Sequence, residues 1–112
     1  MKRYKDNEKT FSEKVVELAL AIPPGRVSTY GHIAHAAGGG GMAAQSITSI
    51  LGKAWRGGEH KIPFHRIVYA DGRIWSSPEH DRERRKLYKK EKIEVDEKGR
   101  IIDFGDKLFP FK

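Results

Sequence analysis

The side chains that could carry out chemistry in this chain are histidines and serines, because the sequence contains no cysteine. His32 and His35 are three residues apart and could share one face of a helix, but no acidic residue nearby completes an HExxH-like zinc site. No serine lies in a G-x-S-x-G turn, and no G-x-x-x-x-G-K-S/T phosphate loop is present. Disulfides, thiolate nucleophiles and cysteine-bound zinc are therefore excluded, surface histidines without a ligand role are favoured, and no cofactor is expected.

The stretch Ile62 to Val68, which reads IPFHRIV, has the pattern of a tight turn that presents one side chain and then enters a strand. Pro63 restricts the backbone before the turn, and the β-branched pair at its end favours an extended conformation. Phe64 occupies the presented position. Its benzyl group has no lone pair with which to attack carbon and no acidic proton to lose, so it is not a nucleophile.

A chain of 112 residues is long enough for a modest core, so one domain spanning residues 1–112 is expected. Lysine and arginine number 22 against 15 aspartate and glutamate, which gives a formal charge of +7. Such an excess favours partners with dense negative charge, above all nucleic acid, with an anionic membrane face or a merely solubilising charge as the alternatives.

The sequence carries no pattern of a membrane span or an export signal. The longest apolar run, near Leu18 to Ile22, is far too short to cross a bilayer, and the opening MKRYKDNEKT lacks the apolar region of a signal peptide. A cytoplasmic or nucleoid-associated protein that does not act at a membrane is therefore expected.

Two helices are predicted before the glycine-rich turn. Thr10 and Glu13 form a capping-box pattern, and apolar residues then repeat at helical spacing up to the Pro-Pro-Gly sequence that stops the first helix. Ser28 or Thr29 is able to cap a second, short helix, which ends at Gly38.

The segment Met42 to Gly52, which reads MAAQSITSILG, contains no charged side chain and predicts a third helix. Its apolar residues gather on one side, while the opposite side, with Gln45, Thr48 and Ser49, is small, neutral and polar. Two short helices joined by a glycine turn match a helix-turn-helix motif. The alternative, an ordinary helical hairpin in a three-helix core, is favoured when this pattern is taken alone.

The C-terminal half predicts a small β-hairpin, because Ile67–Ala70 and Arg73–Trp75 flank an Asp-Gly pair that accepts a two-residue turn. Ser77 as N-cap and Pro78 at the first helical position then predict a fourth helix. Its segment Arg82–Lys92 holds seven basic against two acidic residues, and forms either a solvated face or part of a phosphate-binding surface.

After this helix, Lys98-Gly99 predicts another turn. The apolar residues of the C-terminal tail, Leu108, Phe109 and Phe111, are placed to close over the core. The chain is therefore expected to be mainly α-helical with a small β-hairpin.

The segment Ile22 to Gly38, IPPGRVSTYGHIAHAAG, together with IPFHRIV, resembles the DNA-binding domain of O6-alkylguanine-DNA alkyltransferases, with their PGxVxTYGxIAxxAG opening and PCHRV active-site motif. The similarity continues through ADGRI and LYKKEKIEVDEKGRI, and covers roughly Phe11 to Ile102. In that family the residue between proline and histidine is the cysteine that takes the alkyl group, whereas here it is Phe64. The chain thus resembles the alkyltransferase-like proteins, which recognise alkylated guanine without repairing it and commonly carry tryptophan at this position.

The resemblance implies a winged-helix-like, helix-turn-helix DNA-binding domain that is not an enzyme. It implies recognition of O6-alkylguanine in double-stranded DNA by a monomer that binds the minor groove and rotates the nucleotide out of the stack. Nucleotide excision repair proteins are then the implied partners. The alternatives are a divergent enzyme that uses His65 and Glu91 on another substrate, and a general architectural DNA-binding protein.

The resemblance also assigns roles to single residues. Tyr30 matches the family's tyrosine that helps to turn the nucleotide at its 3′ phosphate, and Gln45 stands where the family has an arginine that enters the base stack. Glutamine is shorter and uncharged but still able to hydrogen-bond to the orphaned base, and Lys53 or Arg56 is a candidate for the missing charge. Phe64, which is aromatic and apolar, is able to line a pocket for the base or the alkyl group.

His65, Arg66 and Glu91 align with the remaining polar residues of the family's active site. Without a thiol to activate, they are expected to be structural, with Arg66 bracing the turn and His65 linked to Glu91 through water. Trp75 falls in the loop that closes over the base in the family, as a pocket wall or as part of the core. The full set of residues expected to bind DNA or the base is Tyr30, Met42, Ala43, Ala44, Gln45, Ser46, Ser49, Phe64, His65, Arg66 and Trp75.

Overall fold

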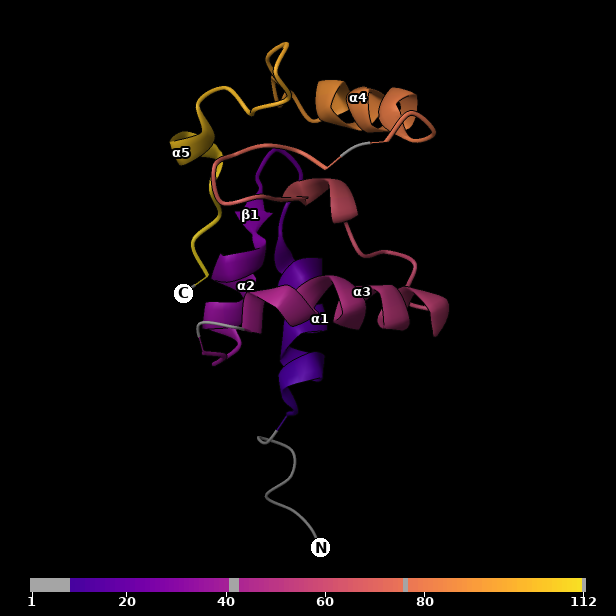
Figure 1. Ribbon diagram of the computed structural model, residues 1–112, viewed down its shortest axis with the longest axis vertical. Helices are drawn as coiled ribbons and strands as arrows, with labels where there is room; N and C mark the ends of the chain where they lie inside the picture. Colours follow the sequence, from indigo (N-terminus) through magenta and orange to yellow (C-terminus); the bar gives the residue numbers. More distant parts are fainter. Residues whose placement is uncertain (1–8, 41–42, 76, 112) are drawn as a thin grey trace, which may run out of the picture.

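The computed structural model describes residues 9–40, 43–75 and 77–111. In Figure 1 the helices α1, α2 and α3 gather in one half of the molecule, while α4 and α5 lie in the other half with the loops between them. None of the helices in the described ranges has the length and apolar character needed to cross a membrane. The elements in chain order are α1 (Phe11–Ala21), β1 (Ser28–Thr29), α2 (Tyr30–Ala36), the 3-10 turn η2 (Ala43–Ser46), α3 (Ile47–Arg56), the 3-10 turn η3 (Phe64–Arg66), β2 (Ile67–Val68), α4 (Asp81–Lys90) and α5 (Phe104–Lys107).

The start of α1 is fixed by the predicted capping box. The Thr10 hydroxyl accepts from the Glu13 backbone N–H at 3.1 Å, and the Glu13 carboxylate accepts from the Thr10 N–H at 2.8 Å. These two bonds satisfy donors that the first turn of a helix leaves unpaired. Ile22 caps the other end with extended dihedrals just before the two prolines, so both predicted ends are confirmed.

Thr29, rather than Ser28, caps α2, because its hydroxyl accepts from the His32 N–H at 3.0 Å. Gly38 follows the helix with φ at +92°, a conformation that glycine adopts without strain, and the predicted stop is confirmed.

The predicted third helix forms in two parts. Ala43–Ser46 make a 3-10 turn, and the α-helix then runs from Ile47 to Arg56, beyond the segment Met42 to Gly52. Ile47 and Leu51 are buried, while Gln45, Thr48 and Ser49 are exposed, as the helical pattern predicted. Met42, the expected first residue of this helix, lies outside the described residues. The helices α2 and α3 correspond to the two helices of the expected helix-turn-helix, and they lie next to each other.

The mainly helical fold class with a small β element is confirmed, but the predicted hairpin is wrong in its pairing. β2 pairs in parallel with β1, with Ser28 opposite Ile67 and Thr29 opposite Val68. The predicted Asp-Gly turn is present and is closed by the Tyr69 N–H, which donates to the Arg73 carbonyl at 2.9 Å. Both residues of β2 are buried, and a strand covered on both faces suits parallel pairing in the core better than an edge hairpin.

The arm after that turn pairs with another part of the chain. Arg73 forms an antiparallel bridge with Arg100, and Ile74 donates its N–H to the Gly99 carbonyl at 2.8 Å. Gly99 itself has φ at +82°, which confirms the turn predicted around Lys98-Gly99. These bonds tie the two C-terminal loops together beside α4 and α5.

The start of α4 also differs from the prediction. Ser77 and Pro78 precede a turn in which the Ser77 carbonyl accepts from the backbone N–H groups of His80 and Asp81. The helix proper begins at Asp81. The Ser77 hydroxyl is hydrogen-bonded to His80 Nδ1, at 2.8 Å, and does not cap the helix. The competing local turn therefore moved the helix start downstream of the proline.

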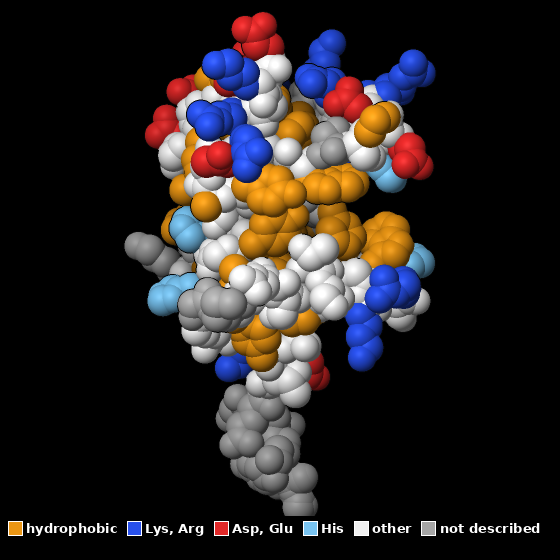
Figure 2. All heavy atoms as spheres, in the orientation of Figure 1, with side chains coloured by type: hydrophobic (Ala, Val, Ile, Leu, Met, Phe, Trp, Pro, Cys, Tyr) orange, Lys and Arg blue, Asp and Glu red, His pale blue; other side chains and the backbone are white. Residues whose placement is uncertain are grey.

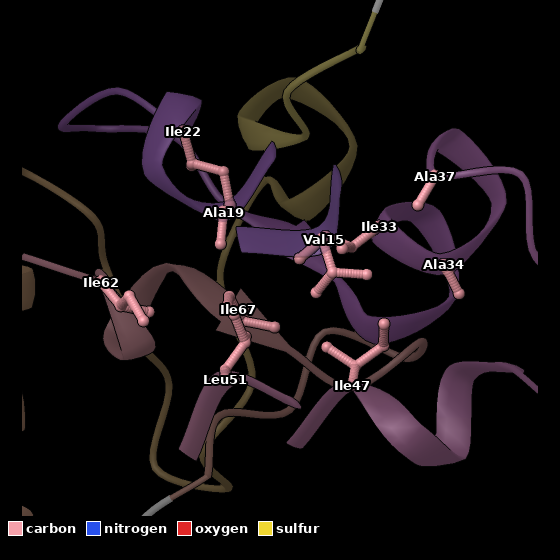
Figure 3. Close-up of a cluster of buried hydrophobic side chains, with 10 residues drawn as sticks. All are labelled: Val15, Ala19, Ile22, Ile33, Ala34, Ala37, Ile47, Leu51, Ile62 and Ile67. Atoms are coloured by element: carbon pink, nitrogen blue, oxygen red, sulfur yellow. The ribbon is translucent and has the colours of Figure 1, made fainter. Parts of the chain in front are cut away.

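The buried apolar side chains form two clusters, one in each half of the molecule. Phe109 and Phe111 from the C-terminal tail pack on the first, as predicted. Ile67 of β2 belongs to the first cluster and Val68 to the second, so this short strand joins the two halves. The first cluster, shown in Figure 3, contains Val15, Ala19, Ile22, Ile33, Ala34, Ala37, Ile47, Leu51, Ile62 and Ile67. The second contains Val27, Val68, Tyr88, Ile93 and Ile101.

Candidate functional site

A cavity of about 560 Å³ lies where α2, the 43–48 segment, the η3 turn and α4 meet. Figure 2 shows hydrophobic side chains gathered in a band across the middle of this face, with most of the charged side chains in the half above it. Aromatic rings from four separate segments supply most of the described wall, and a basic residue, Arg84, adds to it. The lining residues are Tyr30, Ala44, Gln45, Thr48, Phe64, Tyr69, Trp75 and Arg84.

The rings around the cavity support one another at contact distance. Tyr30 and Tyr69 have their ring centroids 5.7 Å apart, and Phe64 meets Trp55 edge to face at 5.7 Å. Such tilted and edge-on pairs are the favourable arrangements for aromatic rings. Each of Tyr30 and Phe64 is thus held against a neighbouring ring, so this part of the wall is formed before any ligand enters.

Phe64 takes its position from the η3 turn. Pro63 precedes the turn, and the Arg66 N–H donates to the Pro63 carbonyl at 2.9 Å, which closes the backbone around Phe64. The phenyl ring is half-buried and lines the cavity. The prediction that IPFHRIV presents one side chain and then enters a strand matches this geometry.

Directly after Phe64 lies a polar cluster of His65, Arg66 and Glu91. Arg66 donates to the Glu91 carboxylate through Nε, at 3.0 Å, and Nη2, at 2.6 Å, and its Nη1 donates to the Ile22 carbonyl at 2.9 Å. The Gly25 N–H also donates to this carboxylate, at 3.2 Å. Arg66 therefore braces the turn against the end of α1, as expected.

His65 and Glu91 contact each other directly, so the expected link through water is wrong. Their Nε2 and Oε2 atoms are 2.8 Å apart, and their side chains are only 11% and 7% exposed. A direct bond forms because the η3 turn and the end of α4 are packed together, which leaves no gap for a solvent molecule. On the far side, the Tyr88 hydroxyl donates to the His65 carbonyl at 2.6 Å.

The electrostatics of this cluster favour a neutral histidine and a charged glutamate. Burial raises the pKa of Glu91, but the hydrogen bonds from Arg66, His65 and the Gly25 N–H outweigh it and hold the pKa at about 2. Burial also lowers the pKa of His65 below its usual value, against the opposing pull of Glu91. A neutral His65 with its proton on Nε2 then donates to the carboxylate. Burial raises the pKa of Tyr88 to about 12, so its hydroxyl stays a donor.

The structure separates the expected binding residues into two groups. Tyr30, Ala44, Gln45, Phe64 and Trp75 come together around the cavity, and Trp75 is part of its wall, being 37% exposed, rather than part of the core. The cavity lining does not include Ala43, Ser46, Ser49, His65 or Arg66.

The expected residues outside the cavity have other partners. The Ser46 hydroxyl donates to the Ala43 carbonyl at 2.7 Å. Ser49 lies in a separate hollow between α1 and α3, although the helical pattern had placed it on the same side as Gln45 and Thr48. Met42 is outside the described residues. Direct DNA contacts by these residues remain predictions.

Three lining residues were absent from the expected set, namely Thr48, Tyr69 and Arg84. Thr48 follows from the helical pattern, because it lies one turn after Gln45 on the same outward face. No pattern in the sequence around Tyr69 or Arg84 indicated a place in the cavity, because β2 and α4 bring these residues to it only in the folded chain.

No three histidine or acidic side chains within residues 9–40, 43–75 and 77–111 are grouped so that they could hold a metal ion. The described lining residues offer aromatic surfaces, the hydroxyls of Tyr30, Thr48 and Tyr69, one amide and one guanidinium. These groups can stack on a flat ring and hydrogen-bond to its edge, and none of them is a ready nucleophile at neutral pH.

Comparisons with known proteins show which family and which relatives this chain resembles. Residues 10–93 match the family described as 6-O-methylguanine DNA methyltransferase, DNA binding domain. A DNA base-flipping protein of Vibrio parahaemolyticus is 41% identical over 92 residues, which are 81% of this chain and 88% of that protein. A DNA base-flipping protein of Escherichia coli K12 is 34% identical over 83 residues, and the match covers 73% of this chain but only 62% of the relative's length.

Two solved structures from S. pombe share the fold. One is Atl1 in complex with damaged DNA containing O6-carboxymethylguanine, with a TM-score of 0.65, 22% identity, and coverage of 99% of this chain and 100% of that one. The other is ATL in complex with DNA, with a TM-score of 0.62, 24% identity and the same coverage. At these identities the likeness is one of fold.

Proposed function

The chain belongs to the 6-O-methylguanine DNA methyltransferase DNA-binding-domain family, and from this membership we propose that it recognises O6-alkylguanine in double-stranded DNA. In this proposal the protein binds the minor groove, and the modified nucleotide rotates out of the stack into the aromatic cavity. The relatives' name, DNA base-flipping protein, supports this mode of binding.

The observation that carries the proposal is the aromatic cavity with Phe64 in its wall. Its volume of about 560 Å³ falls within the range of roughly 300–1,000 Å³ typical of small-molecule sites. A rotated purine loses its stacking neighbours in the duplex, and flat aromatic walls replace part of that contact. Phe64, Tyr69 and Trp75 supply such surfaces without any group that would react with the base.

The entry to the cavity suits a DNA duplex. Ala44, Gln45 and Thr48 line it with short, uncharged side chains, so the backbone of this segment is able to approach the groove closely. In the proposal Gln45 fills the space that the rotated base leaves, and Tyr30 crowds the phosphate beside it. Alkylation at O6 weakens base pairing, so the modified nucleotide costs less to rotate than an ordinary guanine.

The proposed event is binding without chemical change. Phe64 takes the place of a nucleophile, and the whole sequence contains no cysteine that would accept an alkyl group. The imidazole of His65 and the carboxylate of Glu91 are bonded to each other and do not line the cavity. A general base must reach the proton that it removes, and this pair does not face the ligand space.

A competition measurement tests the proposal. Fluorescence anisotropy would compare the affinity for one duplex with a single O6-methylguanine and for the same duplex with guanine, and the recovered DNA would be digested and analysed by mass spectrometry. We expect preference for the modified duplex and an unchanged modified base. Transfer of a labelled methyl group to the protein, or loss of the adduct, would instead show an enzyme. Equal affinity for both duplexes would show an architectural DNA-binding protein.

The proposal extends to partners and location. A monomer of this charge, +7, would act at the nucleoid in the cytoplasm, and its complex with damaged DNA would recruit nucleotide excision repair proteins. Light scattering of the free protein and of the complex tests the monomer, and a dimeric mass would rule it out. Incision assays with purified excision repair proteins test recruitment, which fails if adding this protein leaves the incision rate at O6-methylguanine unchanged.

A further inference from the structure

Among the described residues that line the aromatic cavity, Arg84 is the one basic residue. It projects from α4, and its guanidinium lies over the Trp75 ring, 5.2 Å from the centroid. Its charge lowers the pKa of Tyr30 and of Tyr88, and a hydrogen bond between Arg84 and Tyr88 also lowers the pKa of Tyr88, in both cases against the larger raising effect of burial. A fixed positive charge therefore stands beside otherwise neutral walls.

One end of this guanidinium is not satisfied. Arg84 Nη1 is shielded from solvent and, among the residues that the structure describes, has no hydrogen-bond partner. By contrast, the next residue, Arg85, is paired with Asp81 at 3.0 Å. The buried carboxylate of Glu91 is hydrogen-bonded to Arg66 and His65. A shielded N–H without an acceptor is costly, and arginine in such a place is normally matched to an anion.

We propose that Arg84 makes this site select O6 adducts that carry an acidic group, such as carboxymethyl, over neutral adducts of the same size. The inference rests on the proposed function, because it requires the modified base to enter the cavity. On binding, the Arg84 side chain, which already lines the cavity, would turn its shielded Nη1 towards the adduct. A carboxylate there would accept a charge-assisted hydrogen bond, in surroundings where aromatic walls limit competition from water. A neutral amide on the adduct is able to accept the same hydrogen bond, but without the ionic attraction that strengthens the bond to a carboxylate.

Two duplexes that differ in one group provide the measurement. One contains O6-carboxymethylguanine, and the other contains the O6-carbamoylmethyl derivative, in which a neutral amide replaces the carboxylate. We expect the wild-type protein to bind the acidic adduct about tenfold more tightly, in line with a hydrogen bond between charged groups. Arg84→Gln should reduce this ratio to within about twofold, and Arg84→Lys should give an intermediate ratio because lysine keeps the charge without the planar fork.

Arg82→Gln is the matched control. Arg82 lies on the same helix, is exposed and is not part of the cavity lining, so its removal takes away the same charge at a distance. It should weaken binding to both duplexes by one common factor and leave the ratio unchanged. Circular dichroism melts of all variants check that each remains folded.

The outcomes separate the inference from the function that it builds on. Equal wild-type affinity for the two adducts, with both preferred over guanine, overturns the role of Arg84 but leaves lesion recognition intact. If Arg84→Gln weakens both adducts equally, the residue binds a DNA phosphate instead, and the inference is again wrong. Failure of either adduct to bind more tightly than guanine would remove the proposed function itself.

Discussion

Replacing Glu91 with glutamine tests whether the polar cluster beside Phe64 holds the fold together. The side chain is 7% exposed and receives hydrogen bonds from Arg66, His65 and the Gly25 N–H. These groups belong to the end of α1, the η3 turn and the end of α4, so one carboxylate connects three segments. Glutamine keeps the shape but removes the charge, and leaves the Arg66 guanidinium without its counter-ion.

The pKa of Glu91 gives the size of the effect. It lies at about 2 in the folded protein against a usual value of 4.5, and this gap corresponds to about 3 kcal/mol at roughly 1.4 kcal/mol per pKa unit. Breaking a buried ion pair by removing one partner costs about 3 to 5 kcal/mol. Because Arg66 keeps its bond to the Ile22 carbonyl, we expect a loss of about 2 to 4 kcal/mol.

The pH dependence provides a second test with a defined direction. Because the pKa of Glu91 is lowered by folding, its stabilisation is complete above about pH 4.5 and is lost as pH falls towards about 2. The lowered pKa of His65 acts in the same direction, since the unfolded chain takes up this proton first as pH falls below 6.5. The difference between wild type and Glu91→Gln should therefore shrink in acid, where the protonated carboxyl resembles the amide.

Urea denaturation followed by circular dichroism between pH 3 and pH 7 would measure these differences. Glu17→Gln is the control, because Glu17 is paired with Lys9 on the exposed side of α1 and such pairs are worth at most about 1 kcal/mol. If Glu91→Gln cost no more than this control, or if its cost were the same at both ends of the pH range, the cluster would not have the role assigned to it.

Three further predictions concern DNA binding and a helix cap. Tyr30→Phe and Gln45→Ala should each weaken binding to O6-methylguanine DNA by about 1 to 3 kcal/mol; unchanged anisotropy titrations for both would remove these two residues from the site. Affinity for any duplex should fall steeply as salt rises from 50 to 200 mM, because the basic surface releases counter-ions, and a flat salt dependence would show that this surface is not engaged. Thr29→Ala removes the hydroxyl that accepts from the His32 N–H and should lower the free energy of unfolding by about 1 kcal/mol, with Ser28→Ala testing the alternative cap.

Much of the structure of the helical half can be predicted from residues that are close to one another in the sequence. The capping box of Thr10 and Glu13, the cap at Thr29 and the stop at Gly38 all depend on groups within one helical turn, so their patterns survive in the linear sequence. The lack of cysteine and the presence of Phe64 at the presented position are also properties of the sequence itself. Local bonding and side-chain chemistry are enough to determine such features.

The pairing of β2 with β1, the direct bond between His65 and Glu91, and the arrival of Arg84 at the cavity were decided only in the folded chain. In each case the partners are distant in sequence, and no local pattern states which distant segment will be packed beside them. The same Ile67-Val68 pair suits a hairpin or a buried parallel strand, and burial on both faces selected the second. Tertiary packing therefore determined the wall of the cavity and the positive charge that Arg84 brings to it, because both depend on which segments exclude water together.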